Sequence, residues 1–184
     1  MQKVFILDGP DCTGKSTLAN KLSDIYNIPI YHLTYYDDRE QFQKQFDIAT
    51  DMIKKWVKGE NEGFILDRYI LSEYAYREAF RPEKSLIDNS AEMLDMIEQY
   101  SSLGIVDIIF TLPEDKIKWY DFFTKMCKQR EEMYSGEKML IVYEEYLKLW
   151  KKMRYNKHVY RFDLFKNMKG DNKGKIFNIL NNEN

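Results

Sequence analysis

The stretch 9–17, with the sequence GPDCTGKST, constrains the fold more than any other part of the chain. It matches the pattern G-x-x-x-x-G-K-[ST], which describes a loop that wraps around phosphate groups. Residues 3–8 before it are mostly apolar and partly β-branched, as in a buried strand, and Leu18 and Leu22 after it recur at helical spacing. A strand, a glycine loop and a helix form the setting in which this pattern indicates phosphate binding.

Each fixed residue of the loop has a separate chemical task. Gly9 and Gly14 have no Cβ, so the backbone can adopt conformations closed to other residues and a phosphate can approach closely. Successive backbone N–H groups and the following helix N-terminus favour an anion. Lys15 supplies a positive charge for the terminal phosphates of ATP, and the Ser16 hydroxyl is a ligand for Mg²⁺. The predicted ATP-binding residues are Gly9, Cys12, Thr13, Gly14, Lys15, Ser16 and Thr17.

Short apolar stretches along the chain alternate with segments of helical periodicity. This alternation is typical of a mostly parallel sheet with helices on both faces, where ligands bind beyond the carboxyl ends of the strands. With no repeat or linker, the sequence predicts a single α/β domain over 1–184 with a five-stranded parallel sheet. The expected strands are 3–8, 30–34, 64–66, 105–112 and 158–163; the expected helices are 16–22, 39–58, 71–80, 91–100, 116–154 with an interruption near 135–136, and 171–180.

Composition narrows the class of partner. The net charge of −2 over 184 residues argues against nucleic acid and favours a small-molecule nucleotide. Two cysteines without metal-site or redox-pair spacing, and the absence of a signal peptide or a membrane-spanning stretch, predict a cytoplasmic protein with no membrane partner. His32 is interpreted as a partly buried strand residue rather than a substrate contact.

Asp67-Arg68-Tyr69 follows the third expected strand, at the edge of the sheet where the loop lies. A carboxylate there can hold a Mg²⁺-bound water or orient a nucleophile, and an arginine can grip a phosphate with two hydrogen bonds. The alternative is an ion pair that only finishes the strand. Beside a phosphate loop we favour the functional interpretation, with Asp67 and Arg68 as catalytic residues and Asp67 as a second Mg²⁺ ligand.

The charged segment 125–132, KMCKQREE, allows two interpretations. It can be a solvated helix held by charge pairs three or four residues apart. It can also be part of a lid, about 114–139, that closes on the nucleotide and brings cations to the transferred phosphoryl group. We favour the lid, with Arg130 as its catalytic cation. The aromatic run 119–123 is interpreted first as core, then as dimer surface, then as lid hinge.

Two motifs together resemble the thymidylate kinase family of nucleoside monophosphate kinases. The family loop is acid–Gly–x–acid–x–x–Gly–Lys–[Ser/Thr], here running from Asp8 to Ser16, with Asp11 as the second acid. The second family motif is Asp-Arg-Tyr-x-x-Ser-x-x-Ala-Tyr, and residues 67–76, DRYILSEYAY, match all six fixed positions. The resemblance implies a P-loop NTPase fold of the nucleoside monophosphate kinase type, with a helical lid. The layout is also similar to that of virus-encoded deoxynucleotide kinases.

The resemblance implies roles by position. Asp11 would contact the sugar 3′-hydroxyl of the acceptor, Arg68 would hold its monophosphate, and Asp67 would lie near Mg²⁺. Ser72 and Tyr76 would line the acceptor pocket, and a phenylalanine of the 39–58 helix would stack on the base. The implied substrate-binding residues are Asp11, Phe46, Arg68, Tyr69, Ser72, Tyr76 and Arg77. It also suggests a homodimer formed through apolar helix faces.

Three departures from the family pattern concern the acceptor. The Arg-Glu-Pro that follows the second strand in the family is replaced by 35–39, YYDDR. No arginine stands four residues after Phe42 or Phe46, where the family reads the edge of thymine. Arg77 stands where a glutamine is usual. The residues thus support phosphoryl transfer and leave the base open.

These observations predict an ATP- and Mg²⁺-dependent kinase that phosphorylates a deoxynucleoside 5′-monophosphate, such as dTMP, to the diphosphate. The main alternative is a deoxynucleoside kinase, in which Asp67 would take the proton of a 5′-hydroxyl. Two further alternatives are a kinase of polynucleotide ends and a nucleotide-binding switch without transfer chemistry.

Overall fold

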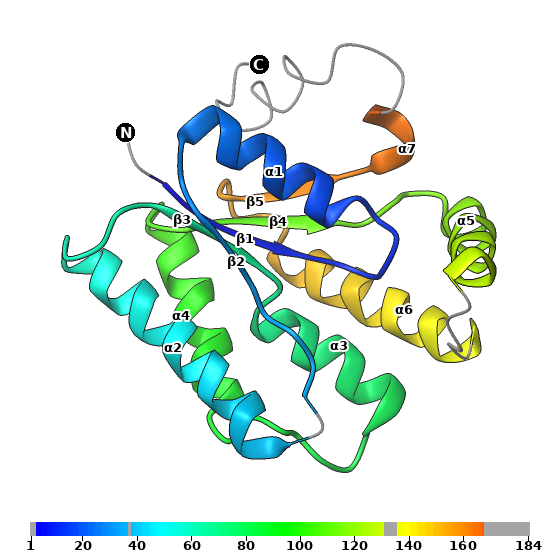
Figure 1. Cartoon of the computed structure of the whole chain (residues 1–184), viewed down its shortest axis with the longest axis horizontal. Coiled ribbons are helices and arrows are strands. Elements are labelled where there is room, and N and C mark those ends of the chain that lie inside the picture. The colour runs from blue at the N-terminus through cyan, green and yellow to red at the C-terminus, as the bar shows by residue number, and fades with distance from the viewer. Residues whose placement is uncertain (1–2, 37, 131–135, 168–184) are drawn as a thin grey trace.

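The computed structural model describes residues 3–36, 38–130 and 136–167, and Figure 1 shows a central sheet between two layers of helices. The five strands are parallel, in the order β2-β3-β1-β4-β5, so the predicted fold class is confirmed. The strands are β1 (Val4–Asp8), β2 (Ile30–His32), β3 (Phe64–Asp67), β4 (Asp107–Thr111) and β5 (Val159–Phe162). The helices are α1 (Lys15–Tyr26), α2 (Arg39–Val57), α3 (Ile70–Phe80), α4 (Ser90–Ser102), α5 (Lys116–Arg130), α6 (Gly136–Met153) and α7 (Leu164–Asn167).

The side chains of β1 show how the two layers are divided. Val4 and Ile6 point to the larger core, which is formed with α2, α3, α4 and α6, while Phe5 and Leu7 point to a smaller core under α1. Because both faces of the sheet are covered, every residue of β1 is buried and the strand reads as a continuous apolar run. In the part of the chain that the structure describes, no helix is both long and apolar enough to cross a bilayer.

Most expected elements lie where the sequence places them, and the differences have local causes. Helix α2 begins at Arg39 because the Asp38 side chain accepts hydrogen bonds from the amides of Glu40 and Gln41, which caps the helix. Strand β2 ends at His32 instead of residue 34, since the backbone amide of Thr34 donates to a side-chain oxygen of α2. The helix expected at 171–180 lies outside the described residues.

Of the region 114–139, the described residues form α5, which ends at Arg130, and the first turn of α6, which begins at Gly136. Trp119 and Phe123 of α5 are buried in the larger core, so the first of the three interpretations of this aromatic run is confirmed. Trp119 stacks on Tyr143 of α6 with ring centroids 5.1 Å apart. The inner face of α5 is therefore part of the domain core here, and closure of this region as a lid stays a prediction.

Candidate active site

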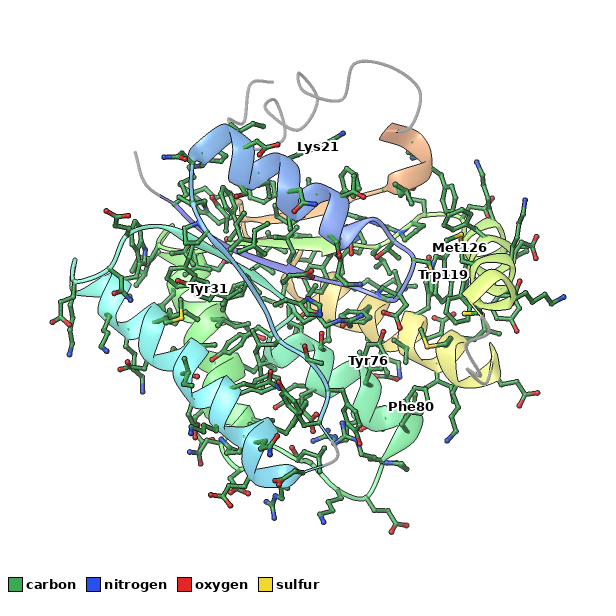
Figure 2. All side chains as sticks on the ribbon, in the orientation of Figure 1. Lys21, Tyr31, Tyr76, Phe80, Trp119 and Met126 are labelled. Carbon is green, nitrogen blue, oxygen red and sulfur yellow. The ribbon has the colours of Figure 1, made fainter. Side chains whose placement is uncertain are left out.

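The carboxyl ends of β1, β3 and β4 bring the two sequence motifs together. Asp8 ends β1, Asp67 ends β3 and Thr111 ends β4, and these three strands are neighbours in the sheet. The loop that follows β1 and the turn that follows β3 therefore lie side by side, as the packing of parallel strands requires. Figure 2 shows Tyr76 on α3 and Trp119 on α5 on the same side of the molecule as this loop.

The glycines of the loop are required by close approach and by backbone conformation. A Cβ on Gly9 would lie 2.3 Å from the carbonyl oxygen of Thr111, so only glycine fits there. Gly14 has φ 84° and is the N-cap of α1, and no side chain caps that helix. The hydroxyl of Thr13 closes the loop by donating to the Pro10 carbonyl at 2.7 Å. The first amides of α1 are thus free of a capping side chain, as an anion site needs.

Lys15 is buried, with its ammonium folded onto the loop. Its Nζ donates to the carbonyl oxygens of Gly9 at 2.8 Å and Pro10 at 2.6 Å. Burial, and then the positive charge of Arg68, lowers the pKa of Lys15 from 10.5 to about 8, against the opposing effect of nearby carboxylates. An anion placed in the loop would favour the charged form and restore the usual pKa.

We expect ATP affinity to fall as the pH rises through the pKa of Lys15. Phosphates favour the protonated ammonium, so above pH 8 nucleotide binding should draw in a proton. The apparent Kd for ATP should be about tenfold higher at pH 9 than at pH 7. Calorimetry at pH 7, 8 and 9, in buffers with different heats of ionisation, measures both effects. Lys15→Ala should bind ATP more weakly and without this pH dependence; an equal slope in the variant would contradict the assignment.

Asp67 contacts the predicted Mg²⁺ ligand Ser16. The Ser16 hydroxyl donates to Asp67 Oδ2 at 3.4 Å, and His32 Nδ1 lies 3.0 Å from the same oxygen. The other oxygen, Oδ1, is buried and has no hydrogen-bond partner among the described atoms. A hydroxyl beside a carboxylate with an unused buried oxygen fits a Mg²⁺ ion, which prefers oxygen ligands. His32 lies in strand β2, as predicted, but its side chain is 53% exposed and is bonded to Asp67, so only the expectation that it is partly buried is corrected.

Asp11 and Arg68, the two predicted acceptor contacts, form an ion pair with each other. Burial alone would raise the pKa of Asp11, but the charges of Arg68 and Lys15 outweigh it and lower the pKa. The guanidinium of Arg68 also lies 5.2 Å from the ring centroid of Tyr76. Arg68 and Asp11 are both partly exposed, so a ligand can reach this pair.

The backbone at Arg68 is strained in a way that aims its side chain. Its φ of 76° lies in the left-handed region that non-glycine residues rarely adopt. The amide of Arg68 donates to the carbonyl of Leu7 at 2.9 Å, and the next amide, that of Tyr69, donates to Asp8 Oδ2 at 3.0 Å. Such strain persists where neighbouring contacts fix the conformation, and it is common at functional sites.

Asp8 holds this turn in place, a role that the motif alone did not reveal. It is fully buried and accepts hydrogen bonds from the Ser72 amide at 3.2 Å and the Ser72 hydroxyl at 2.5 Å. The Tyr146 hydroxyl of α6 donates to it at 2.6 Å. Burial raises the pKa of Asp8 against the effect of these bonds. Helix α3 has no capping side chain of its own, so Asp8 caps it from the neighbouring strand.

Trp119 is a second residue of the site that the sequence did not reveal. Its indole Nε1 donates to the backbone carbonyl of Asp11 at 2.9 Å, which anchors the loop to α5. A buried indole N–H needs an acceptor, and a loop carbonyl is a suitable one. No sequence signal marks this contact, because residues 11 and 119 are distant in the chain.

The remaining predicted residues are arranged in different ways. Phe46 and Tyr69 stack on each other in the core, with ring centroids 5.7 Å apart. Ser72 is bonded to Asp8, and the guanidinium of Arg77 contacts Tyr74 and Glu78 instead of the Asp11–Arg68 pair. The structure therefore leaves the acceptor roles of these residues as predictions. The side chain of Arg130 lies outside the described part, so its role is also a prediction.

The strand–loop–helix unit, the buried lysine and the parallel sheet define an α/β P-loop NTPase fold. No protein-family model matches the chain. Over 130 residues the chain is 26% identical to a protein described as "Putative thymidylate kinase" from Acidianus bottle-shaped virus (isolate Italy/Pozzuoli). This match covers 70% of the chain and 81% of the relative. This match supports the resemblance to thymidylate kinase-like P-loop kinases.

Solved structures share the fold over almost the whole chain. YorR from Bacillus subtilis, solved in complex with phosphorylated GDP, has a TM-score of 0.68 at 19% identity, covering 98% of this chain and 97% of that one. Deoxyadenosine kinase from M. mycoides with bound dATP has a TM-score of 0.56 at 16% identity, covering 97% of both chains. These similarities show that the chain shares the fold of these proteins.

Proposed function

We propose that this chain is an ATP- and Mg²⁺-dependent kinase that phosphorylates a deoxynucleoside 5′-monophosphate to the diphosphate. The observation that carries the proposal is the position of Arg68. Its strained backbone holds the guanidinium against the phosphate loop, where it forms an ion pair with Asp11. One cation, Lys15, serves the donor phosphates and the second, Arg68, serves an acceptor phosphate, as transfer between two nucleotides requires.

The chain's own residues divide the task between donor, acceptor and transferred group. Backbone amides of the loop and Lys15 would hold the β- and γ-phosphates of ATP. Arg68 would orient the acceptor phosphate, and Asp11 would be freed from its ion pair to accept from the sugar hydroxyl. Ser16 and Asp67 would hold Mg²⁺, which supplies charge neutralisation on the phosphates when bound. An acceptor phosphate is already ionised, so no strong general base is needed.

The Asp8 and Trp119 contacts support the same mechanism through positioning. They fix the turn that carries Arg68 and the loop that carries Lys15 before any ligand arrives. Preorganised charges of this kind contribute more to transfer than charges that must be ordered in the transition state. The predicted lid and Arg130 would add a further cation after closure. A homodimer and a cytoplasmic setting remain predictions of the resemblance and the composition.

The function is tested by ADP release from ATP and Mg²⁺ against a panel of acceptors. The panel contains the deoxynucleoside 5′-monophosphates, their ribose counterparts and the free nucleosides. Turnover with deoxynucleoside monophosphates alone is the expected result. Turnover with nucleosides alone would replace this proposal by a 5′-hydroxyl kinase with Asp67 as general base. If the protein binds ATP but turns over none of these acceptors, a kinase of polynucleotide ends becomes the next hypothesis, which a salt-sensitive gel shift would test. If that also fails, the remaining hypothesis is a nucleotide-binding switch without transfer chemistry.

We expect Arg68→Ala to impair use of the monophosphate far more than use of ATP. Loss of a two-pronged contact to the acceptor phosphate should lower kcat/KM for the monophosphate by about 100-fold or more, with KM for ATP changed less than about threefold. Initial rates with each substrate varied in turn measure both constants. Arg68→Lys keeps the charge but not the planar fork, so its kcat/KM for the monophosphate should lie between the values for the wild type and Arg68→Ala. An equal loss for both substrates would contradict the assignment.

A further inference from the structure

Glu73 is a buried carboxylate in the first turn of α3 that the mechanism above does not use. Its side chain is 0% exposed, and its two oxygens accept from Arg81 at 2.9 and 3.5 Å. The Ser85 hydroxyl and the Leu86 amide also donate to it, at 3.1 and 3.0 Å. A buried carboxylate persists where donors satisfy it, so Glu73 holds the guanidinium of Arg81 in one orientation.

The side chain of Arg81, at the end of α3, extends toward aromatic residues of α2 and of the loop before it. Its guanidinium carbon lies 5.8 Å from the ring centroid of Tyr35 and 6.0 Å from that of Phe42 in α2. Its side chain stays partly exposed, at 19%, although its partner Glu73 is fully buried. Glu73 accepts from two nitrogens of the guanidinium, which has five N–H donors, so three remain for another acceptor.

The position of Arg81 along α3 fits the base of a nucleotide bound at Arg68. Arg68 lies over the ring of Tyr76, and Tyr76 stacks on Phe80 with ring centroids 6.1 Å apart. Figure 2 shows Tyr76 and then Phe80 along α3, progressively further from the phosphate loop. Arg81 follows directly, about 7.5 Å of helix rise beyond Tyr76. A phosphate at Arg68 and a sugar near Tyr76 would direct the base toward Arg81.

We propose that Arg81, fixed by Glu73, reads the base of the acceptor and selects bases that present a carbonyl oxygen. This inference rests on the proposed function, because it describes the acceptor pocket of that site. Arginine only donates hydrogen bonds, so it complements the C6 oxygen of guanine or the C4 oxygen of thymine and uracil. An amino group at the same position, as in adenine or cytosine, would oppose donor to donor and leave both unpaired.

The proposal also accounts for a departure seen in the sequence. No arginine follows Phe42 or Phe46 at the spacing that the resemblance requires. Arg81 instead places an arginine beside Phe42 from the end of α3, with its guanidinium carbon 6.0 Å from the centroid of that ring. Tyr35, which is half exposed, is placed to cover a base from the β2–α2 loop.

The test uses acceptor pairs in which one member has a ring carbonyl and an adjacent ring N–H, and the other has an amino group and an adjacent ring nitrogen without hydrogen. The pairs are dUMP with dCMP, and dIMP with dAMP. For the wild type, kcat/KM should favour the carbonyl member of at least one pair by about 10- to 100-fold. Arg81→Gln offers both a donor and an acceptor, so the ratio should fall to within about threefold. Arg81→Lys, which remains a pure donor, should keep part of the preference, and Arg154→Gln, an exposed arginine just beyond α6, should leave it unchanged.

Two outcomes would overturn the proposal, and folding is controlled separately. A wild type that prefers the amino members overturns it without any variant. Equal losses for all acceptors in Arg81→Gln, at an unchanged thermal midpoint, would reduce the Glu73–Arg81 pair to a structural contact. Binding of the same nucleotides, measured by calorimetry, separates this proposal from the proposed function. Arg81-dependent carbonyl selection in binding, without turnover, would support the former and refute the latter.

Discussion

Replacing Lys15 by alanine should lower ATP-dependent phosphoryl transfer by at least about a thousandfold while the fold stays intact. The ammonium carries a full positive charge on a flexible side chain, so it can move with the transferred phosphoryl group. The backbone amides are neutral and fixed, so they cannot replace it. The structure also predicts that this variant is no less stable. Burial lowers the pKa of Lys15 from 10.5 to about 8, so the ammonium is still charged at neutral pH but its burial costs the folded protein free energy that alanine does not cost.

The matched control is Lys21→Ala, which removes a lysine of the same helix that makes no contact with the loop carbonyls. It should retain wild-type turnover. Coupled ADP-release rates, with thermal midpoints of all three proteins, separate catalysis from folding. If Lys15→Ala still formed ADP with a deoxynucleoside monophosphate at a comparable rate, the mechanism proposed for the loop would be wrong.

Asp8→Ala should be the most destabilising single substitution in the site. It removes the acceptor for the amides of Gly9, Tyr69 and Ser72 and for the hydroxyls of Ser72 and Tyr146. Buried donors that lose their acceptor cost about 1–3 kcal/mol each before relaxation. We expect a loss of about 3 kcal/mol in the free energy of unfolding, which corresponds to a thermal midpoint roughly 6–12 °C lower. Calorimetric or circular dichroism melting measures it.

Two further variants separate this role of Asp8 from simple loss of packing. Tyr146→Phe removes one of the donors and should cost only about 1 kcal/mol. Asp8→Asn keeps one acceptor oxygen and should fall between Tyr146→Phe and Asp8→Ala. Because Asp8 caps α3 and fixes the turn at Arg68, both Asp8 variants should also raise KM for the acceptor. A thermal midpoint of Asp8→Ala within 2 °C of the wild type, on the scale of a surface substitution, would rule out this role.

The fold could be predicted from the sequence because its signals are local. Buried strands such as 3–8 read as apolar runs, and helices such as α2 show apolar residues three and four apart between clear end signals. Parallel strands then place their carboxyl ends at one edge, so Lys15 and Asp67 could be assigned to one site from the sequence alone. The limits of β2 were harder to predict, since they depend on a side chain of α2.

The parts of the site that sequence reasoning missed depend on contacts between distant residues. Asp8 was recognised only as a motif position, although it caps α3 across the sheet. Arg81 follows directly after the expected helix 71–80, and nothing in its neighbours along the chain indicates that a buried Glu73 orients it. Arg77, which the resemblance selected, turns toward Tyr74 instead.

By itself, the sequence determined the fold class, the phosphate loop and the strand-end acid and arginine. Each of these is encoded in residues that are neighbours in the chain or repeat at a fixed period. Only the tertiary structure decided which charges meet: Asp11 with Arg68, Asp67 with Ser16 and His32, and Glu73 with Arg81. The physical reason is that burial and partner geometry determine what a charged side chain does, and both arise only when distant segments are folded against one another.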